Sequence, residues 1–445
     1  MKNILLKILK PIIDKSIKDI FTKDYAENDF INITAVQKLG LKNIVDCQLR
    51  AEKGKILSIP YGSNINFSPW DKLLLNPRQL FEMPTESVNM IKTEVIIGKN
   101  AKRPLKLSMP IMITGMSYGG SLSLRMKIAL AKGASKVGIS TNTGESVLTK
   151  EVRKHARYVI GQIHRADLMR DEDLKELDAI EIRFGQGAWG GLTESTMYAK
   201  DIRSRLGSEW GLNGGGDVKF KARVGGINSK GDLIKLVNKL KKDYEVPIGI
   251  KIAGTGFIEQ ELDVITSTKC DYIVIDGCEG GTAKAPPTLE DHMGLPTLYA
   301  LIRAVNYLEK NNIRDKYDLI ITGGLTNPGQ FLKALALGAN AVYIGSIALF
   351  AVIHNQAVKA MPKYPPTQLA LYTGKVAHKL DINLAAISLS NFLISCKEEM
   401  KLALQGMGKK DIKDLTTDDL VSLDKEISNY TDIRYALDKR INNNE

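Results

Sequence analysis

Eight short apolar runs, which alternate with longer helical patterns, constrain the fold of this chain more than any other feature. The runs lie at residues 110–114, 137–140, 158–160, 179–183, 247–252, 272–275, 319–321 and 341–344. Short runs of isoleucine, valine and leucine bounded by glycine and polar residues are typical of buried parallel strands. Because strand and helix alternate over about 240 residues, we predict an α/β fold, a (β/α)8 TIM barrel rather than an open doubly wound sheet.

The last two apolar runs end in glycine and predict a phosphate site. The seventh runs into Thr322-Gly323-Gly324-Leu325, and the eighth runs into Gly345-Ser346. Between them, Asn327 is expected to cap a helix that begins at Pro328. Glycines at strand ends let backbone N–H groups approach an anion, and the turns after strands seven and eight of a barrel commonly hold phosphate. Tight turns without a ligand are the alternative.

Both flanks of the predicted barrel, which spans residues 109–350, are expected to be extensions packed on it. Residues 1–108 carry an N-terminal helix followed by mixed short strand and loop signals. Residues 351–445 show helical patterns at 384–404 and 411–437, so we expect a C-terminal helical extension.

The first 21 residues predict a basic amphipathic helix with a bend at Pro11. Lysines surround an apolar stripe that consists of Ile4, Leu5, Ile8, Leu9, Ile12 and Ile13. A stripe of this kind usually covers a protein core, so we favour docking on the body of the protein, with contact to anionic lipid as the alternative. No apolar run reaches the roughly 18 residues that a transmembrane helix needs.

Charge and cysteine usage exclude several functional classes. The formal net charge of +12 is accompanied by no aromatic-interleaved basic cluster and no nucleic-acid motif, so we expect anionic substrates and cofactors rather than nucleic acid. The four cysteines, Cys47, Cys270, Cys278 and Cys396, lack metal-ligand spacing, and no metal site is predicted. A long chain with no disulfide framework and no signal-peptide pattern fits a reduced, cytoplasmic location.

Lys251 is the leading candidate for chemistry, because it ends the fifth apolar run. A buried lysine there must face an anion, a cofactor or a carboxylate, and a structural ion pair is the alternative to ligand contact. The turn 276–282 follows the sixth run and offers backbone groups, acids and a hydroxyl to a heteroaromatic ring or a substrate carboxylate. An ordinary tight turn is again the alternative.

Further polar groups follow the second and fourth runs. They are Asn142, Glu145, Arg183 and Gln186. Since the C-terminal ends of barrel strands share one face, we expect these groups around one mouth, where they would bind a planar polar cofactor and a small anion. A glycine-rich insertion at 188–227 follows the fourth run and is predicted to be a lid or binding loop. His292 is either a proton shuttle or an ordinary loop histidine.

Several motifs, taken in order along the chain, resemble the FMN-binding central domain of glutamate synthase. They are Met116–Ser123, Asn142–Glu145, Gln186–Ala188, Asp276–Pro286, His292–Pro296, Thr322–Leu325 and Gly338–Ala339. Each motif is short, but their order over roughly residues 60 to 425 is specific.

The resemblance implies FMN as cofactor and an oxidoreductase acting on CH–NH2 donors. In such an enzyme, flavin N5 exchanges hydride with a small amino, imino or oxo acid of the glutamate and 2-oxoglutarate type. We assign catalytic roles to Lys251 and Glu145, and substrate contacts to Arg183, Gln186 and Trp189. We assign cofactor contacts to Met116, Ser117, Asn142, Lys251, Gly280, Gly281, Thr282, Gly323, Gly324, Leu325, Gly345 and Ser346. The expected partners are a small anionic substrate, an electron-donor protein and a second copy of the chain.

Three departures set this chain apart from the family it resembles. The stretch 354–368, where the family carries iron–sulfur ligands, contains no cysteine, so no thiolate-bound cluster is expected. The sequence starts without a glutaminase domain or its N-terminal cysteine, so we expect no release of ammonia from glutamine by this chain itself. Trp189 stands where the family has a lysine that helps to hold 2-oxoglutarate, which removes a cation and adds a stacking surface.

These features leave three functional hypotheses. The first is an FMN-dependent oxidoreductase resembling glutamate synthase, whose substrate can differ from 2-oxoglutarate. The second is a subunit that supplies N-methylglutamate-type amino-transfer chemistry. The third, from a different class, is a non-catalytic FMN-binding or sugar-phosphate-binding protein.

Overall fold

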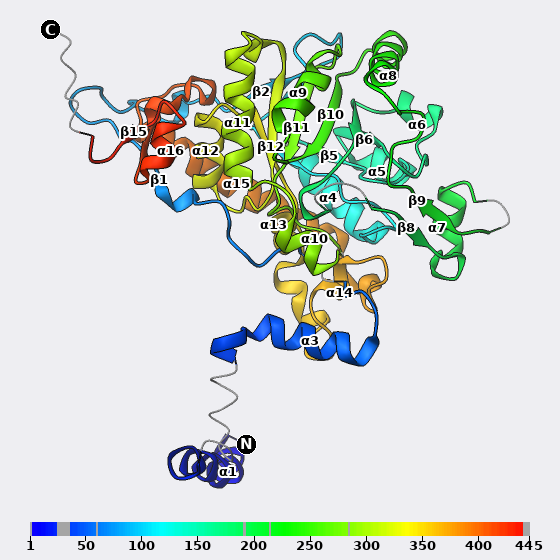
Figure 1. Cartoon of the computed structure of the whole chain (residues 1–445), viewed down its shortest axis with the longest axis vertical. Helices are drawn as coiled ribbons and strands as arrows, with labels where there is room; N and C mark the ends of the chain where they lie inside the picture. The colour runs from blue at the N-terminus through cyan, green and yellow to red at the C-terminus, as the bar shows by residue number, and fades with distance from the viewer. Residues whose placement is uncertain are drawn as a thin grey trace. The chain divides into compact units, whose positions relative to one another are not determined.

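The chain forms two compact units, Met1–Ser58 and Ile59–Glu445. The computed structural model describes residues 2–24, 36–58, 61–189, 193–212, 215–283 and 285–438. The second unit contains the whole barrel, and the segments before and after it pack around the barrel (Figure 1). The division at residues 108 and 350, drawn from the rhythm of the sequence, stays a prediction.

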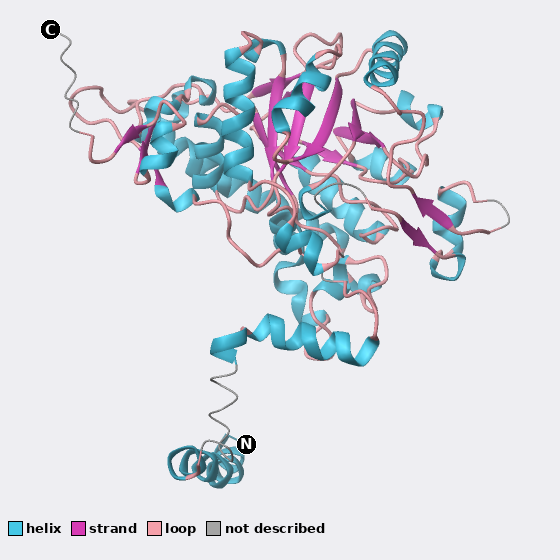
Figure 2. Ribbon diagram, viewed as in Figure 1, coloured by secondary structure: helices cyan, strands magenta, loops and turns pink. Residues whose placement is uncertain are grey.

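Eight parallel strands form the sheet at the centre of the second unit (Figure 2). They are β4 (Ile111–Ile113), β5 (Ser140–Asn142), β6 (Tyr158–Ile163), β7 (Ala179–Arg183), β10 (Ile248–Ala253), β11 (Tyr272–Asp276), β12 (Asp318–Thr322) and β13 (Ala341–Ile344). From β5 to β13 each strand pairs with the next strand of this sheet in chain order, and β13 pairs with β4. Because β4 and β5 also contact each other, the sheet nearly closes, and the predicted (β/α)8 barrel is confirmed.

One strand lies later in the chain than predicted. The run 137–140 was expected to be the second strand, but β5 covers Ser140–Asn142. Val137 ends the preceding helix and Gly138 adopts a φ of +74°, so these two residues make the turn that leads into the strand.

Helices surround the barrel. They are α4 (Leu124–Lys136), α5 (Lys150–His155), α6 (Asp171–Lys175), α8 (Lys230–Asp243), α9 (Ile258–Thr266), α10 (Pro287–His292), α11 (Thr297–Lys310), α12 (Pro328–Ala336) and α13 (Ser346–Ile353). Side-chain caps start several of them; Asn327 accepts a hydrogen bond of 3.0 Å from the backbone of Gln330 at the start of α12, as predicted. This cap fixes where the chain leaves the glycine turn after β12.

The insertion after β7 has structure of its own. It contains η4 (Gly187–Trp189), β8 (Ser195–Met197), η5 (Ala199–Asp201), α7 (Ser204–Glu209) and β9 (Val218–Phe220). β8 and β9 form an antiparallel hairpin. Trp210 and Phe220 pack in a small core with Tyr118 and Val147, which belong to the turns after β4 and β5. The insertion therefore packs against loops at the C-terminal end of the barrel.

The segment before the barrel covers its opposite end and its side. It contains η2 (Trp70–Lys72), β1 (Leu73–Leu75), η3 (Val88–Met90) and the antiparallel pair β2 (Val95–Ile97) and β3 (Leu105–Leu107). Gly98, in the turn after β2, donates a backbone hydrogen bond of 2.6 Å to Asp318, the first residue of β12. This hairpin therefore lies at the N-terminal end of the barrel strands.

The segment after the barrel begins with helices and ends in a small sheet. It contains η7 (His354–Lys359), α14 (Thr367–Ala370), η8 (Ala377–Lys379), α15 (Ile382–Gly406), η9 (Ile412–Asp414), η10 (Thr417–Asp419), β14 (Leu420–Ser422), α16 (Lys425–Asn429) and β15 (Arg434–Tyr435). Within the barrel, the short helix η6 (Arg314–Lys316) precedes β12. The helix predicted at 384–404 is confirmed as α15, which packs against α4.

The helix predicted at 411–437 is wrong. Asp411, Thr416 and Asp424 bind nearby backbone N–H groups with their side chains and start separate short turns. Between these turns, β14 pairs antiparallel with β1 from the other end of the unit. A partner strand that is remote in sequence overrides the local helical pattern.

The first unit is helical. It contains α1 (Lys2–Thr22), which includes Pro11, and α3 (Leu41–Lys53), which the mixed signals of this region did not predict. Leu9, Ile12, Ile13 and Phe21 of α1 are exposed, so the choice between the body of the protein and lipid stays open. Among the described residues, no helix is both long and apolar enough to span a bilayer.

Candidate active site

The C-terminal ends of β7, β10 and β11 bring three charged residues together. Parallel pairing sets Lys251 beside Arg183 on one side, and sets Ala253 beside Asp276 on the other. The ammonium of Lys251 forms a buried ion pair of 2.8 Å with Asp276 and donates to the Thr114 hydroxyl at 3.4 Å. The second carboxylate oxygen of Asp276, Oδ1, is buried and accepts no hydrogen bond within the described residues. Lys251 is thus matched in charge, while one acceptor beside it stays open.

Glu145 lies between two arginines at this mouth. Its carboxylate is 2.7 Å from Nη1 of Arg183 and 2.9 Å from Nε of Arg165. Burial alone would raise the pKa of Glu145, but the two guanidinium groups together lower this pKa to about 2. Glu145 is therefore a carboxylate at neutral pH, and it forms ion pairs with both arginines.

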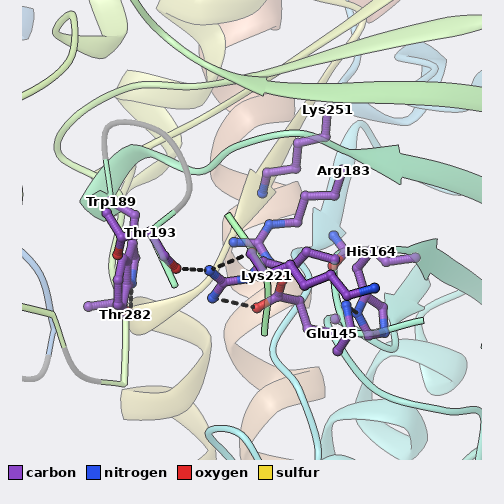
Figure 3. A network of polar contacts seen from close by, with 12 residues as sticks. Glu145, His164, Arg183, Trp189, Thr193, Lys221, Lys251 and Thr282 are labelled. Carbon is purple, nitrogen blue, oxygen red and sulfur yellow. Dashed lines mark hydrogen bonds and ion pairs between the residues drawn. The ribbon is translucent and has the colours of Figure 1, made fainter. Parts of the chain in front are cut away.

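Arg165 joins this cluster to the insertion. Its guanidinium lies 5.7 Å from the ring centre of Trp189 and 5.6 Å from that of Phe220. It also donates to the carbonyl oxygens of Thr193 and Lys221, which lie near the two ends of the insertion. Figure 3 shows Thr193 and Lys221 close to Glu145 in this network. The sequence reading missed Arg165, although its place directly after the third strand was a usable signal.

Trp189 ties the insertion to the turn after β11. Its indole Nε1 donates a hydrogen bond of 3.3 Å to the hydroxyl of Thr282 (Figure 3). The stacking surface that replaces the family's lysine is thus occupied by the cation of Arg165 on one side.

His164 is a buried histidine that the sequence reading also missed. Burial lowers its pKa to about 4, so the ring is neutral at physiological pH. Nδ1 accepts a hydrogen bond of 3.3 Å from the backbone of Ala166, which assigns the proton to Nε2. That N–H, like Nε of Arg183, is buried and finds no acceptor among the described residues. Two donors close to Glu145 are therefore left unsatisfied.

The turns after β4 and β5 interlock. Gly144 has a φ of +67°, and a Cβ on it would lie 2.5 Å from the backbone nitrogen of Ser117. The buried ammonium of Lys127, on α4, donates to the carbonyl oxygens of Met116 at 2.7 Å and Asn142 at 2.5 Å. Burial lowers the pKa of Lys127 to about 7. Lys127, not anticipated from the sequence, holds two of the expected cofactor turns at a fixed spacing.

A buried polar network lies inside the barrel behind Asn142. Glu181 accepts hydrogen bonds from Gln162 at 2.6 Å, from Tyr343 at 2.9 Å and from the Asn142 amide at 3.4 Å. The side-chain oxygen of Asn142, Oδ1, accepts a hydrogen bond of 2.9 Å from the backbone N–H of Gly144. The side chain of Asn142 is thus held in one orientation by the barrel interior.

The turns after β12 and β13, where phosphate is expected, each contact the turn after β11. A Cβ on Gly281 would collide with the hydroxyl of Ser346, so the turns after β11 and β13 touch there. Gly324 has a φ of +68°, and a Cβ on it would lie 2.8 Å from Glu279. Ser346 begins α13 beside Gly345, and the first N–H groups of a helix have no partner within it. Bare backbone and free N–H groups fit the phosphate of a flavin nucleotide.

The segment before the barrel reaches the same turn. Tyr61 donates a backbone hydrogen bond of 2.8 Å to Thr282. The Ser68 hydroxyl donates at 2.6 Å to Glu279, whose carboxylate also accepts from the backbone of Thr297 at the start of α11. Residues 61–68 therefore brace the turn 276–282, a role the sequence did not reveal.

The remaining predicted residues are less engaged. Gln186 is half-buried in the turn after β7, and the Leu325 side chain is buried in the main hydrophobic core. His292 ends α10 and is exposed. Within the described ranges no group of cysteine, histidine and acidic side chains has the arrangement of a metal site.

Comparisons with known proteins agree with this geometry. Residues 68–410 match the family described as a conserved region in glutamate synthase. The archaeal-type glutamate synthase [NADPH] of Thermotoga maritima is 29% identical over 413 residues, which cover 87% of this chain and 81% of that protein. A glutamate synthase large subunit-like protein of Rhizobium meliloti is 30% identical over 389 residues, covering 82% and 87%.

Solved structures share the fold at low identity. Flavocytochrome b2 with pyruvate bound superposes with a TM-score of 0.52 and 14% identity, covering 81% of this chain and 80% of that one. The recombinant flavin-binding domain of baker's yeast flavocytochrome b2 gives a TM-score of 0.51 at the same identity and coverage. With a family match over most of the chain, the protein belongs to the glutamate synthase family, as a TIM-barrel FMN oxidoreductase.

Proposed function

We propose that this FMN-dependent oxidoreductase reduces a small imino acid, formed from a 2-oxo acid and ammonia, to the corresponding amino acid. When bound, FMN supplies the hydride. The observation that carries the proposal is the charge balance of the barrel mouth: Arg165 and Arg183 share one carboxylate, Glu145. With Lys251 matched by Asp276 and His164 neutral, the two arginines keep one positive charge that their shared partner Glu145 does not offset. A substrate carboxylate would offset it.

The unsatisfied donors support the same assignment. Nε of Arg183 is buried without an acceptor in the described part of the chain. A buried donor left unpaired costs about 1–3 kcal/mol, and a carboxylate oxygen would satisfy it. We therefore assign the substrate carboxylate to Arg183, with Gln186 and Trp189 beside it.

The cofactor contacts follow from the turns. Met116, Ser117 and Asn142, held in place by Lys127, would face the flavin ring together with the turn Gly280–Thr282. Gly323, Gly324, Leu325, Gly345 and Ser346 would hold the phosphate through backbone N–H groups, with the Leu325 side chain turned into the core. The close contacts between these turns are consistent with both the ring contacts and the phosphate contacts.

Two residues have distinct roles in proton handling and positioning. The Nζ atom of Lys251 lies beside the open acceptor of Asp276, which supports Lys251 as the group that delivers a proton to the nitrogen of the substrate. Glu145 orients the two arginines and stays ionised. The catalytic role expected for Glu145 is thus better described as positioning.

Further expectations about this protein belong with the proposal. A cytoplasmic location fits the redox state of the unpaired cysteines. An electron-donor protein and a separate source of ammonia would complete the reaction. Association with a second copy of the chain is a separate expectation. The alternative, N-methylglutamate-type amino transfer, would use the same mouth with a bulkier amine.

One preparation tests the proposal. Protein purified without added cofactor should be yellow, release FMN on denaturation, and be reducible under anaerobic conditions. Reoxidation of the reduced flavin should require a 2-oxo acid together with ammonium, and methylamine in place of ammonium would identify the alternative. A flavin that is reduced but is not reoxidised by any 2-oxo acid and amine would refute this reaction, and a colourless protein that takes up no FMN would favour a sugar-phosphate-binding role.

A further inference from the structure

A cavity of about 520 Å³, open to solvent and with Arg125, Lys359 and Lys379 exposed, lies at the surface among the helices outside the barrel. None of its lining residues belongs to the active site. α4 contributes Arg125, Ile128 and Lys132 to its wall. The other lining residues are His155, Lys359, Lys379, Leu380, Asp381, Ile382 and Asn383. Pockets that bind small molecules usually have volumes of about 300–1,000 Å³, so this cavity has room for one.

The charges in this cavity are strongly unbalanced. Arg125, Lys132, Lys359 and Lys379 are cations, and Asp381 is the single acidic residue in the lining. The Asp381 carboxylate accepts backbone hydrogen bonds at 2.9 Å and 3.0 Å from the first turn of α15, which makes it the helix cap. Three of the four cationic charges therefore have no counter-charge in the wall.

Neutral acceptors hold three of the four cations in place without neutralising them. Nε of Arg125 donates to the Leu380 carbonyl at 2.8 Å, and Lys132 donates to the Asn383 side chain at 2.6 Å. Lys359 donates to the Gln356 side chain at 2.8 Å. None of the four lining cations forms an ion pair with a carboxylate of the described residues. These cationic side chains are thus positioned by hydrogen bonds, but their charges are not balanced by carboxylates.

Such an arrangement matches phosphate chemistry. Clustered like charges repel one another, and an anion between them relieves the repulsion and gains charge-assisted hydrogen bonds. The pKa of His155 is lowered by burial and, to a smaller extent, by the positive charges of Lys132 and Lys154. Ile128 and Ile382, which are partly exposed, give the wall an apolar part, which free inorganic phosphate would not use.

We propose that this basic cavity binds a small organic diphosphate, such as a nucleoside diphosphate, at a site separate from the flavin. The phosphates would lie among Arg125, Lys132, Lys359 and Lys379. The organic group would contact the aliphatic side chains of the wall.

The test uses FMN-saturated full-length protein, so that the flavin phosphate turns are filled. Binding of ADP and of pyrophosphate is measured by calorimetry at physiological ionic strength. The double variant Lys132→Met, Lys359→Met should weaken ADP binding at least tenfold. Lys136→Met serves as the matched control, because it removes a lysine from the same helix outside the cavity, and it should leave the affinity unchanged. FMN content should be equal in all three proteins.

The outcomes separate the sources of binding. ADP binding several-fold tighter than pyrophosphate supports an organic diphosphate, and a rise in the His155 pKa on ADP addition, followed by NMR, locates it in the cavity. Equal affinity for both probes would overturn the organic part of the proposal and leave a phosphate site. Absence of binding by either probe, or equal weakening by the control variant, would overturn the site altogether.

Discussion

Glu145 and Arg183 form a buried ion pair of 2.7 Å that connects the turn after β5 to the end of β7. Since Arg165 shares the same carboxylate, Glu145→Gln would leave two buried guanidinium groups without a counter-charge. Breaking a buried pair in this way costs about 3 kcal/mol or more. We expect a lower melting temperature and a reduced kcat with FMN still bound. Glu151→Gln, which removes an exposed partner of Arg205, is the control, and equal melting temperatures for the two variants would contradict this role.

The second prediction concerns Gly144, whose backbone leaves no room for a side chain. Gly144→Ala would put a methyl group against the backbone of Ser117 in addition to imposing an unfavourable φ. Gly211→Ala imposes a similar φ of +71° in open space, so it carries the backbone cost alone. We expect both variants to lose stability, but only Gly144→Ala to lose FMN, as measured by flavin absorbance after gel filtration. Retention of FMN by both would remove this turn from the site.

Lys127 is predicted to matter for the cofactor without touching it. Lys127→Met keeps the length of the side chain but leaves the Met116 and Asn142 carbonyl oxygens without their buried donor. Each unsatisfied carbonyl costs about 1–3 kcal/mol, so the two turns should separate. The FMN dissociation constant, from fluorescence titration, should rise at least tenfold, and Lys127→Arg should restore part of it. An unchanged constant would assign Lys127 to general stability.

His164 predicts a pH effect on stability. Its folded pKa of about 4 lies below the ordinary histidine value of 6.5, so the unfolded chain takes up a proton first as pH falls. The stability contributed by the neutral ring is complete above pH 6.5 and is lost as pH falls toward 4, by about 3 kcal/mol. Urea unfolding at several pH values should show this slope in the wild type and a weaker one in His164→Gln. Parallel slopes would mean that other groups cause the acid sensitivity.

The fifth prediction concerns iron. Because residues 354–368 contain no cysteine, purified protein should carry FMN without iron or acid-labile sulfide. Elemental analysis and the visible spectrum check this directly. Iron and sulfide in stoichiometric amounts would show that a cluster is bound by other ligands.

Local sequence patterns predicted the barrel because its signals are local. Strand runs such as 272–275 lie where expected, and Asn327 caps its helix as its position before Pro328 suggested. The same logic failed at 411–437, because the pairing of β14 with β1 depends on residues far away in sequence. The periodicity of apolar residues within a segment cannot reveal a partner strand that is remote in sequence.

The sequence revealed candidate site residues that a glycine or a strand end marks. It did not reveal those whose importance depends on being buried in the folded protein. Lys251 stood out because it interrupts an apolar run. Lys127 lies within a helix rich in other lysines, so nothing local separates the one that points inward. The importance of Arg165 becomes visible only in the folded protein, where the insertion brings Trp189 and Phe220 close to its guanidinium.

Arg165 has one further consequence. Its guanidinium binds carbonyl oxygens near both ends of the insertion, at Thr193 and Lys221, so one side chain closes this long loop at its base. Leu206 and Trp210, from the middle of the same loop, pack against Tyr118 and Val147 in the turns after β4 and β5. The loop is therefore held both at its base and at its centre, so that a change in its buried side chains would reach the turns that border the barrel mouth.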